Sequence, residues 1–326
     1  MDMKIRIGIG VHAWPFPERH ASYFYDFIDQ CDDMGVDSLW FSDRIIGAEG
    51  LLDPVVTMAV VAARSKKMKL GTSALVLPQR NPVVLAKELA SLDFLSNGRL
   101  LLVVGLGQDD PIHYQSFGLD KKERGRRTDE SIMALRKLWI EKTATFDGRY
   151  YSFRDVSIEP KATQQGGPPI WIGGRSDAAL RRTGRLGDGW LSSAITPEES
   201  RLGVMDIRRY AAEAGRAIPE DHYGVSIQCT IADTRGSAED IAAPYFASRR
   251  SDVAPETYSI FGTSDDIISR LKQYESGGIT KFVLRPVCPP EQWISQVERL
   301  AKEVIHPIQT PFSEEELRER AGVVAP

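Results

Sequence analysis

Cysteine is scarce in this sequence of 326 residues, which has only Cys31, Cys229 and Cys288, far apart and with no C-x-x-C pair. This spacing argues against a disulfide framework and against a structural zinc site built on cysteines. It is typical of a reducing compartment, so we expect a cytoplasmic protein. Long hydrophobic runs are also missing: no apolar stretch approaches the ~18 residues of a membrane span, and no signal-peptide core precedes the first strand pattern. We therefore expect no membrane partner.

A basic field is absent as well, because the formal net charge is -4 at pH 7. The densest basic cluster, Arg124–Arg127, has Glu123 and Asp129 beside it, which favours a solvated or ion-paired helix face. We therefore expect no nucleic-acid partner.

Several catalytic signatures are missing too, namely G-x-S-x-G, H-E-x-x-H, the P-loop and the dinucleotide fingerprint. Asp109, Asp110 and His113 could coordinate a metal ion, but no further ligands follow at a suitable spacing. No metal site is predicted.

Strand and helix patterns alternate along the whole chain. The eight apolar strand segments cover residues 5–11, 38–42, 69–77, 99–106, 169–174, 189–193, 223–232 and 281–287. Such strands, each followed by a helical segment, are typical of a parallel sheet covered by helices. Eight units favour a (β/α)8 TIM barrel, an α/β fold, although periodicity alone leaves an open doubly wound sheet possible. We expect a single domain over residues 1–326, with a peripheral tail at 306–326 that is solvated or packs on a partner subunit.

Three insertions interrupt this alternation. Residues 107–122 follow the fourth strand, 143–165 precede the fifth strand and contain an Asp147–Gly148 hairpin turn, and 244–261 follow the seventh strand. Because the loops after the strands form the active face of a barrel, these three insertions are candidate pocket walls or lids.

The segment 168–190 predicts an anion site. An apolar run ends in Gly173–Gly174, and a helical segment begins at Arg175–Ser176. Glycines let a phosphate approach the backbone, and a helix N-terminus offers amide donors and a positive dipole end. Arg175 and Ser176 can add side-chain donors. The alternative is an ordinary strand–helix turn in which Ser176 is the N-cap and Asp177 satisfies the dipole.

Further polar or glycine positions lie at the C-terminal ends of the predicted strands. They are His12, Asp43, Arg44, Ser73, Gly105, Gly107, Gln108, Trp190, Gln228 and Arg285. Each has a structural alternative, such as an Asp43–Arg44 ion pair or a core role for Trp190. Arg285 is the hardest to explain structurally, because a guanidinium in an apolar strand needs an anionic partner. Since no acid–base team is evident, we expect a bound cofactor to carry the chemistry.

The motif at residues 70–107, LGTSALVLPQRNPVVLAKELASLDFLSNGRLLLVVGLG, resembles the signature of the luciferase-like monooxygenase superfamily. The segments FDGRYYSF at 146–153, PPIWIGG at 168–174 and FVLRP at 282–286 continue the resemblance in the same order. It implies a (β/α)8 barrel, usually a homodimer, that binds reduced FMN or the deazaflavin F420 in the barrel mouth and acts on a small molecule. It also implies a cis peptide at Ser73–Ala74 behind the flavin ring and a phosphate at Gly173–Ser176.

One departure limits what the resemblance transfers. F420-dependent dehydrogenases of this superfamily carry an Asp–His pair after the second strand and a Glu after the fourth-strand glycines, where this chain has Asp43–Arg44 and Gln108. The mechanism built on that His and Glu is therefore not carried over. Arg44 cannot act as a base at neutral pH, but it can hold an anionic substrate.

Our leading hypothesis is an oxidoreductase that transfers hydride between F420 and a small organic substrate. We expect His12, Arg44 and Gln108 to contact the substrate, with His12 as the best proton donor. The expected cofactor contacts are Asp43, Ser73, Ala74, Gly105, Gly107, Gly173, Gly174, Arg175, Ser176 and Trp190. The alternatives are an FMNH2-dependent monooxygenase, a phosphate-binding barrel isomerase or aldolase without flavin, and a non-catalytic flavin-binding relative.

Overall fold

The computed structural model describes residues 4–48 and 50–322, and it confirms a closed barrel of eight parallel strands. In order around the barrel these are β1 (Arg6–Val11), β2 (Ser38–Phe41), β3 (Lys69–Thr72), β5 (Leu100–Gly105), β8 (Ile170–Gly173), β9 (Gly189–Ser193), β10 (Tyr223–Ile231) and β12 (Lys281–Pro286). The pairing of β12 with β1, in the register Arg6 to Lys281, closes the ring.

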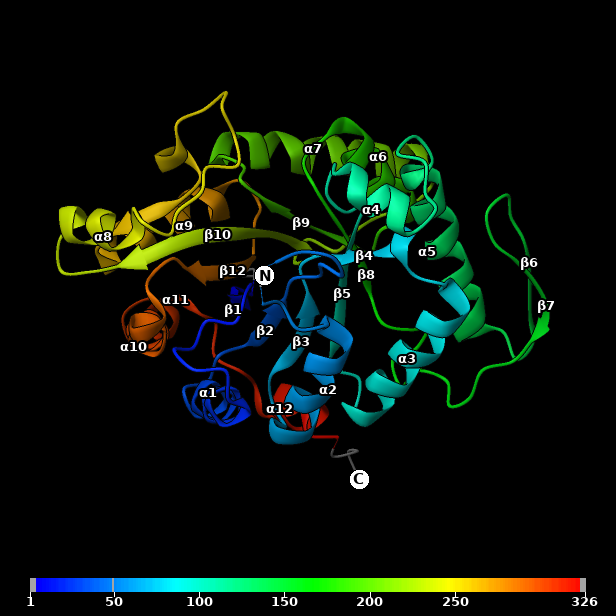
Figure 1. Cartoon of the computed structure of the whole chain (residues 1–326), viewed down its shortest axis with the longest axis horizontal. Helices are drawn as coiled ribbons and strands as arrows, with labels where there is room; N and C mark the ends of the chain where they lie inside the picture. The colour runs from blue at the N-terminus through cyan, green and yellow to red at the C-terminus, as the bar shows by residue number, and fades with distance from the viewer. Residues whose placement is uncertain (1–3, 49, 323–326) are drawn as a thin grey trace.

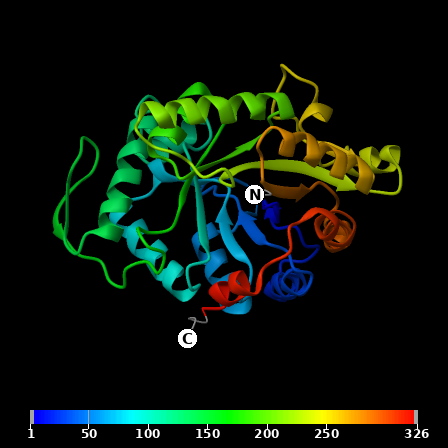
Figure 2. The same cartoon turned by 180° about the vertical axis from the view of Figure 1, so that it is seen from behind.

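Helices surround the strands on the outside (Figures 1 and 2). The principal ones are α1 (Ala21–Asp33), α2 (Pro54–Arg64), α3 (Pro82–Leu95), α5 (Arg124–Ile140), α6 (Asp177–Leu186), α7 (Pro197–Glu213), α9 (Ser264–Ser276) and α10 (Trp293–Leu300), the last continued by a π-turn (Ala301–Ile305) and α11 (His306–Ile308). Most of the buried apolar side chains pack between the strands and these helices, as expected for an α/β barrel.

The inside of the barrel is a second, smaller core. Its largest members are Trp40 and Trp171, which pack with Leu101, Val103, Leu191 and Val283. Glycines make room for both indoles: a Cβ at Gly71 would lie 2.2 Å from Trp40, and one at Gly189 would lie 2.4 Å from Trp171. Large and small residues on neighbouring strands thus fill the interior, so that the open space lies above this layer.

The three insertions occur where they were predicted. The first insertion contains α4 (Pro111–Ser116), and the third contains a short helical turn (Pro255–Thr257). The second insertion is the hairpin of β6 (Ala144–Asp147) and β7 (Ser152–Val156), which projects to one side in Figure 1. Two elements between the seventh strand and α9 were not predicted: α8 (Arg235–Ala242) and β11 (Ile260–Gly262), which pairs with β10 outside the barrel ring. Both are short and carry little periodic signal.

The predicted strand at 69–77 is corrected. It consists of β3, a bulge at Ser73–Ala74, β4 (Leu75–Val76) and a helical turn at Leu77–Gln79. The hydroxyl of Thr72 bridges the interruption, because it donates to the Val103 carbonyl at 2.8 Å and accepts from the Val103 amide at 3.0 Å.

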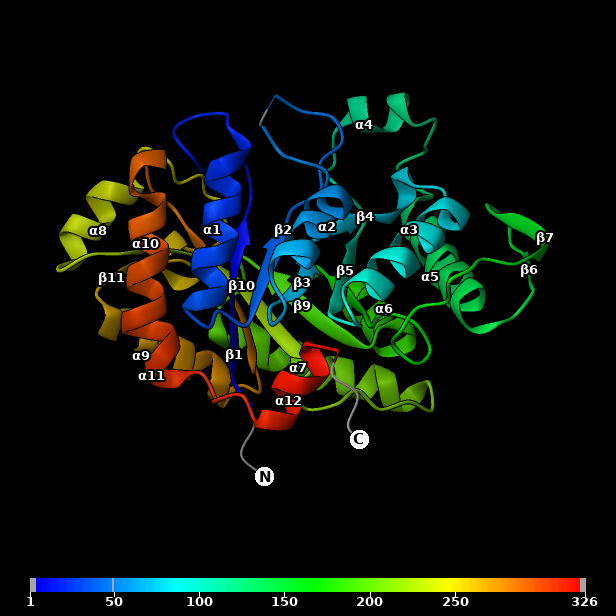
Figure 3. The ribbon, with the colours of Figure 1, turned by 90° about the horizontal axis from the view of Figure 1, so that it is seen from below.

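The C-terminal tail, which we expected to be peripheral, closes the bottom of the barrel with α12 (Glu314–Arg320). Figure 3 shows this helix at the end of the molecule opposite α4. Arg320 is 8% exposed and donates to Asp37 Oδ1 at 2.8 Å, and Asp37 also pairs with Lys281. The tail is thus fixed by a buried charge cluster, up to residue 322, and is not simply solvated.

Candidate functional site

A cavity of about 910 Å³ lies at the C-terminal ends of the barrel strands. Eleven of the sequence-predicted site residues line it: His12, Asp43, Arg44, Ser73, Ala74, Gly105, Gly107, Gln108, Gly173, Gly174 and Ser176. Arg175 and Trp190 do not line it; both border a separate hollow between α6 and α7. The second insertion, 143–165, does not line it either, so the expectation that it forms a pocket wall is corrected. The barrel mouth therefore collects residues from most of the strands, as the alternation predicted.

The bulge after β3 forms one wall of this cavity. The Ser73–Ala74 peptide bond is cis, as the resemblance implies. The Ser73 amide donates to the Phe41 carbonyl at 2.7 Å, which holds the bulge against β2. The bulge therefore presents the Ser73 hydroxyl and the Ala74 methyl group to the cavity.

The part of the cavity beside Ala74 is bounded by strand-end glycines. A Cβ at Gly105 would lie 3.2 Å from the Ala74 methyl carbon, and one at Gly173 would lie 3.4 Å from it. Gly107 has a φ of +80° and Gly174 a φ of +104°, conformations that side chains rarely adopt. The result is a surface of backbone and one methyl group, which a flat ring system could approach closely.

The turn after β8 leads directly into the N-terminus of α6. Ser176 is the N-cap of α6, and its hydroxyl accepts from the Ala179 amide at 3.3 Å. The amides of Ala179 and Leu180 both donate to the Ser176 carbonyl and so begin the hydrogen bonding of α6. The amides before the first bonded ones in a helix have no partner within the helix and are the groups that can bind an anion.

Asp177 is directed away from this turn. Its carboxylate accepts from the Tyr210 hydroxyl at 2.5 Å and from Arg181 Nε at 2.8 Å. The hydrogen bond from Tyr210, followed by that from Arg181, lowers the pKa of Asp177. The structure therefore has the N-cap of the alternative interpretation, but the carboxylate does not line the cavity.

Trp190 supports the turn from behind. Its side chain is fully buried, and its indole Nε1 donates to the Gly174 carbonyl at 2.7 Å. Successive strand residues face opposite sides, so Leu191 points into the barrel while Trp190 packs outward against Gly203 of α7. Trp190 therefore contacts the backbone of the turn and does not line the cavity, where a direct cofactor contact was expected.

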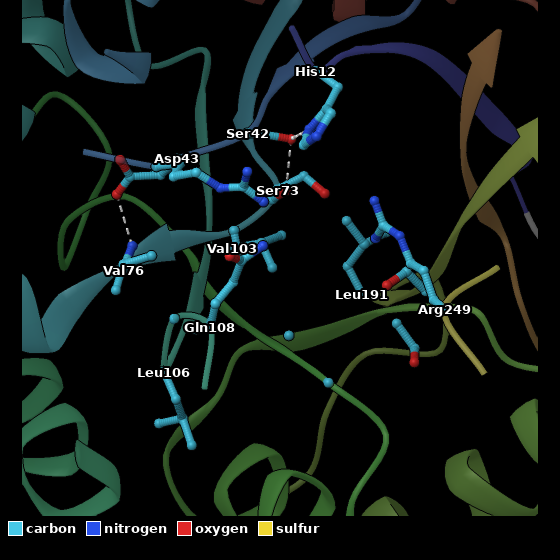
Figure 4. Close-up of a pocket in the computed structure, with 18 of the residues that line it drawn as sticks. His12, Ser42, Asp43, Ser73, Val76, Val103, Leu106, Gln108, Leu191 and Arg249 are labelled. Atoms are coloured by element: carbon cyan, nitrogen blue, oxygen red, sulfur yellow. Dashed lines mark hydrogen bonds between the residues drawn. The ribbon is translucent and has the colours of Figure 1, made fainter. Parts of the chain in front are cut away.

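Asp43 fixes the segment behind the bulge. Its carboxylate accepts from the Val76 amide at 2.9 Å and from Arg80 Nη2 at 2.9 Å (Figure 4). Asp43 therefore pairs with Arg80, a residue just after the third predicted strand, and not with Arg44. Arg44 itself lines the cavity.

A hydrogen-bonded chain joins three strand ends. His12 Nδ1 lies 3.0 Å from Ser42 Oγ, and Figure 4 shows His12, Ser42 and Ser73 together on one side of the pocket. Arg285 Nη2 donates to Ser42 Oγ at 3.2 Å and to the carbonyl and hydroxyl oxygens of Ser73, each at 3.0 Å. Ser42 thus links the candidate proton donor to the bulge.

The cavity lining is strongly basic although the chain is acidic overall. Five arginines line it, namely Arg44, Arg124, Arg182, Arg249 and Arg285, against a single acidic residue, Asp43, which is paired with Arg80. Burial, and then the charge of Arg249, lower the pKa of Arg285 to about 9, so this group is still charged at neutral pH. Such a lining attracts anions.

Two of these arginines come from helices and were not predicted as site residues. Arg124 belongs to the cluster for which a solvated or ion-paired helix face is expected, but it lines the cavity and donates to the Tyr114 hydroxyl at 2.8 Å. Arg182 pairs with Asp129 and donates to the Gly125 carbonyl at 3.1 Å. The sequence does contain one indication for Arg124. It begins a predicted helix directly after the insertion 107–122, which follows the fourth strand.

The third insertion covers one side of the mouth and is anchored by Arg250. This arginine, whose side chain is 4% exposed, binds both carboxylate oxygens of Glu199 on α7, at 2.7 and 2.9 Å. Tyr245, Ser248 and Arg249 of the same insertion line the cavity. The anchor therefore sets where Arg249 lies.

No metal site is evident: residues 4–48 and 50–322 contain no group of three or more His, Cys, Asp or Glu side chains placed to hold an ion. In the same part of the chain, no helix is long and apolar enough to cross a membrane.

A closed ring of eight parallel strands with a cavity of about 910 Å³ at their C-terminal ends defines an α/β TIM barrel. The sequence model of one family, the luciferase-like monooxygenases, matches residues 1–302. The chain belongs to this family.

Named relatives differ in cofactor. The chain is 31% identical over 226 residues to an F420-dependent glucose-6-phosphate dehydrogenase of Amycolatopsis mediterranei, covering 67% of this chain and 66% of the relative. It is 30% identical over 220 residues to an FMNH(2)-dependent dimethylsulfone monooxygenase of Pseudomonas putida, covering 67% of this chain and 58% of the relative. The matched stretches thus span less than two thirds of either relative's length.

A solved structure supports the fold. The crystal structure of the monooxygenase RslO1 from Streptomyces bottropensis superimposes with a TM-score of 0.79 at 22% identity, covering 93% of this chain and 99% of that one. At this identity the likeness concerns the barrel and not the reaction.

Proposed function

We propose that this protein is an oxidoreductase that binds F420 in the barrel mouth and catalyses hydride transfer on a small organic substrate. The observation that carries the proposal is the turn Gly173–Ser176 at the N-terminus of α6, which faces the same cavity as the Ser73–Ala74 bulge. A phosphate donor set and a surface for a flat ring, within one cavity of about 910 Å³, suit a phosphate-bearing deazaflavin.

The residues present fit such a cofactor. Gly173, Gly174 and Ser176 would hold the phosphate, and the wall of Ala74, Gly105 and Gly107 would lie against the ring. Bound F420 supplies or accepts the hydride, whereas the chain itself contributes position and electrostatics.

The substrate side of the proposal rests on His12, Arg44 and Gln108. His12, held through Nδ1 by Ser42, would deliver or take a proton at its ring, and Arg44 would orient an anionic or carbonyl group. The insertion that carries Tyr245 would help to exclude water from the cavity.

An FMNH2-dependent monooxygenase is the second candidate. The observation that favours it is the replacement of the dehydrogenase pattern by Asp43–Arg44 and Gln108, together with the similarity to the Pseudomonas monooxygenase. The fitting residues are the same, because both cofactors combine a flat ring system with a phosphate.

Titration of the apo-protein with F420 and with FMN, followed by absorbance and isothermal calorimetry, tests both candidates. Tighter binding of F420 supports the proposal, and tighter binding of FMN supports the monooxygenase. If neither binds, the proposed function is wrong. Turnover with the preferred cofactor then separates an enzyme from a non-catalytic flavin-binding relative.

A homodimer is part of the same proposal. The neighbouring helices α2 and α3 expose several large apolar side chains, namely Val56, Val84, Phe94 and Leu95, of which Leu95 is 68% exposed. Apolar groups gathered on two packed helices are typical of a protein interface. Light scattering of the purified protein would measure the mass, and a monomer at micromolar concentration would contradict this part.

A further inference from the structure

Arg285 of β12 is a buried cation without a carboxylate partner. It is 7% exposed, and no carboxylate of residues 4–48 and 50–322 lies within ion-pair distance of it. Its Nη2 donates to three neutral oxygens of Ser42 and Ser73, while its Nε has no partner in the described part of the chain. Burying a guanidinium without a counter-charge is unfavourable, so the arrangement calls for an anion.

The fold makes specific room for this arginine. Its stem passes over Gly10 of β1, where a Cβ would lie 2.7 Å from Arg285 Cγ and 3.0 Å from Nε. A glycine at that strand position is what permits a long charged side chain to point into the barrel mouth.

A small pocket beside Arg285 holds further partnerless polar atoms. It has a volume of about 10 Å³ and is lined by Ser226 and Ser259, whose hydroxyls lack a partner among the described residues. Both serines are almost fully buried, at 4% and 2% exposed. The same pocket shares Gln228, Arg249 and Arg285 with the main cavity, so the two hollows adjoin at these residues.

The size of this pocket limits how much of a ligand can enter it. A volume of about 10 Å³ admits one water-sized group, so one oxygen atom of an anion fits there while its second oxygen lies on the side of the main cavity. The planar guanidinium fork matches the two oxygens of a carboxylate. The phosphate turn Gly173–Ser176 follows β8, which is separated from β12 around the barrel by β9 and β10, so the two anion sites are distinct.

We propose that Arg285, Arg249, Ser226 and Ser259 form a subsite for a carboxylate of the substrate, so that the substrate is an organic acid. This inference rests on the proposed function, because it assigns the substrate class to the same cavity. The subsite binds the carboxylate at Arg285, while the rest of the molecule extends into the main cavity towards His12.

The test uses benzoate as the probe and its neutral isostere benzamide as the comparison, titrated into the apo-protein by isothermal calorimetry. The wild type is expected to prefer benzoate by about tenfold or more, because a charge-assisted pair is lost with benzamide. R285M is expected to lose that preference, whatever its affinity for the preferred cofactor, because Arg285 also holds Ser73 of the bulge. R64M is the matched control: Arg64 of α2 is paired with Asp29 and does not line the cavity, so its benzoate binding should equal that of the wild type.

Equal binding of benzoate and benzamide by the wild type, or unchanged benzoate binding by R285M, would overturn the proposal, since the small pocket then holds only water. Loss of cofactor affinity in R285M with benzoate binding retained would also overturn it, because Arg285 would then belong to the cofactor site. If circular dichroism shows that R285M does not fold, R249M carries the test, with at least a severalfold loss of benzoate affinity expected and no loss contradicting the subsite. Selective benzoate binding in a wild type that binds neither cofactor would sink the proposed function alone.

Discussion

Replacing Ser176 by alanine separates the two roles assigned to this residue. The hydroxyl caps α6 by accepting from the Ala179 amide at 3.3 Å, and it faces the cavity where the cofactor phosphate is proposed to bind. Loss of an N-cap costs about 1 kcal/mol of folding free energy. Loss of one charge-assisted hydrogen bond to a phosphate costs a further ~1.5–3 kcal/mol of binding free energy.

We therefore expect Ser176→Ala to lower the free energy of unfolding by about 1 kcal/mol in a urea titration. Its affinity for the preferred cofactor should fall by about ten- to a hundredfold in isothermal calorimetry. The loss of binding free energy should be the larger of the two. The hydrogen bond that caps the helix is long, at 3.3 Å, whereas the hydrogen bond to the phosphate would be charge-assisted.

Thr263→Ala provides the matched control. Thr263 caps α9, where its hydroxyl accepts from the Asp266 amide at 3.3 Å and also donates to Asp266 Oδ2 at 3.0 Å, but it does not line the cavity. The control should lose a similar free energy of unfolding and bind the cofactor as the wild type does. If Ser176→Ala and Thr263→Ala have equal cofactor affinity, the turn after β8 does not bind the phosphate and the site assignment is wrong.

Three further outcomes are expected. Arg44→Lys should lower kcat/KM, because lysine cannot bind the substrate in the bidentate geometry of arginine. Arg44→His should bring no gain in activity that titrates near pH 6.5 in a profile from pH 6 to 9. A gain of that kind would show that the residue transfers protons. Trp190→Phe, which removes the N–H donated to Gly174, should weaken cofactor binding several-fold in calorimetry, by ~0.5–1.5 kcal/mol, and unchanged affinity would remove its positioning role. Asp37→Asn should lower the free energy of unfolding by about 3–5 kcal/mol, because it leaves Lys281 without its buried counter-charge. Burial would raise the pKa of Asp37, but Lys281 and then Arg320 outweigh this and lower it. Its stabilisation is therefore present above the unfolded pKa of about 3.9 and lost as the pH falls below it, so in urea titrations the deficit of Asp37→Asn should shrink from pH 7 to pH 3.

The barrel could be predicted from the sequence because its signals are local. Each apolar strand is followed by its own helix, and Gly173–Gly174 marks the turn by composition alone. The resemblance added the cis peptide at Ser73–Ala74, which no propensity rule would suggest. Strand ends of a parallel barrel converge whatever their exact register, so most strand-end candidates, such as His12 and Gln108, reached the same cavity.

The errors concern features that depend on register or on distant partners. Trp190 was placed in the cofactor site because it lies at a strand end, but a shift of one residue decides which face a strand side chain takes, and Leu191 has the inward face. A local ion pair of Asp43 with Arg44 is the structural alternative that sequence neighbours suggest, whereas Asp43 pairs with Arg80 across the bulge. The role of α12 depends on Arg320 reaching Asp37, a contact across most of the chain's length.

The two ends of β12 show how position in the barrel separates stability from function. Lys281 and Arg285 stand four residues apart on one strand, so their side chains point to the same, inward face. At the N-terminal end, Lys281 is neutralised by Asp37, which also binds Arg320 of the tail, and the cluster closes the barrel. At the C-terminal end, Arg285 has only hydroxyl and carbonyl oxygens from the described residues and faces the cavity. Burying a charged side chain on folding is costly unless it meets a counter-charge. Ligands of barrel enzymes bind at the C-terminal ends of the strands, where Arg285 lies. The unequal pairing of two inward cations on one strand therefore favours a ligand at Arg285 over a purely structural role.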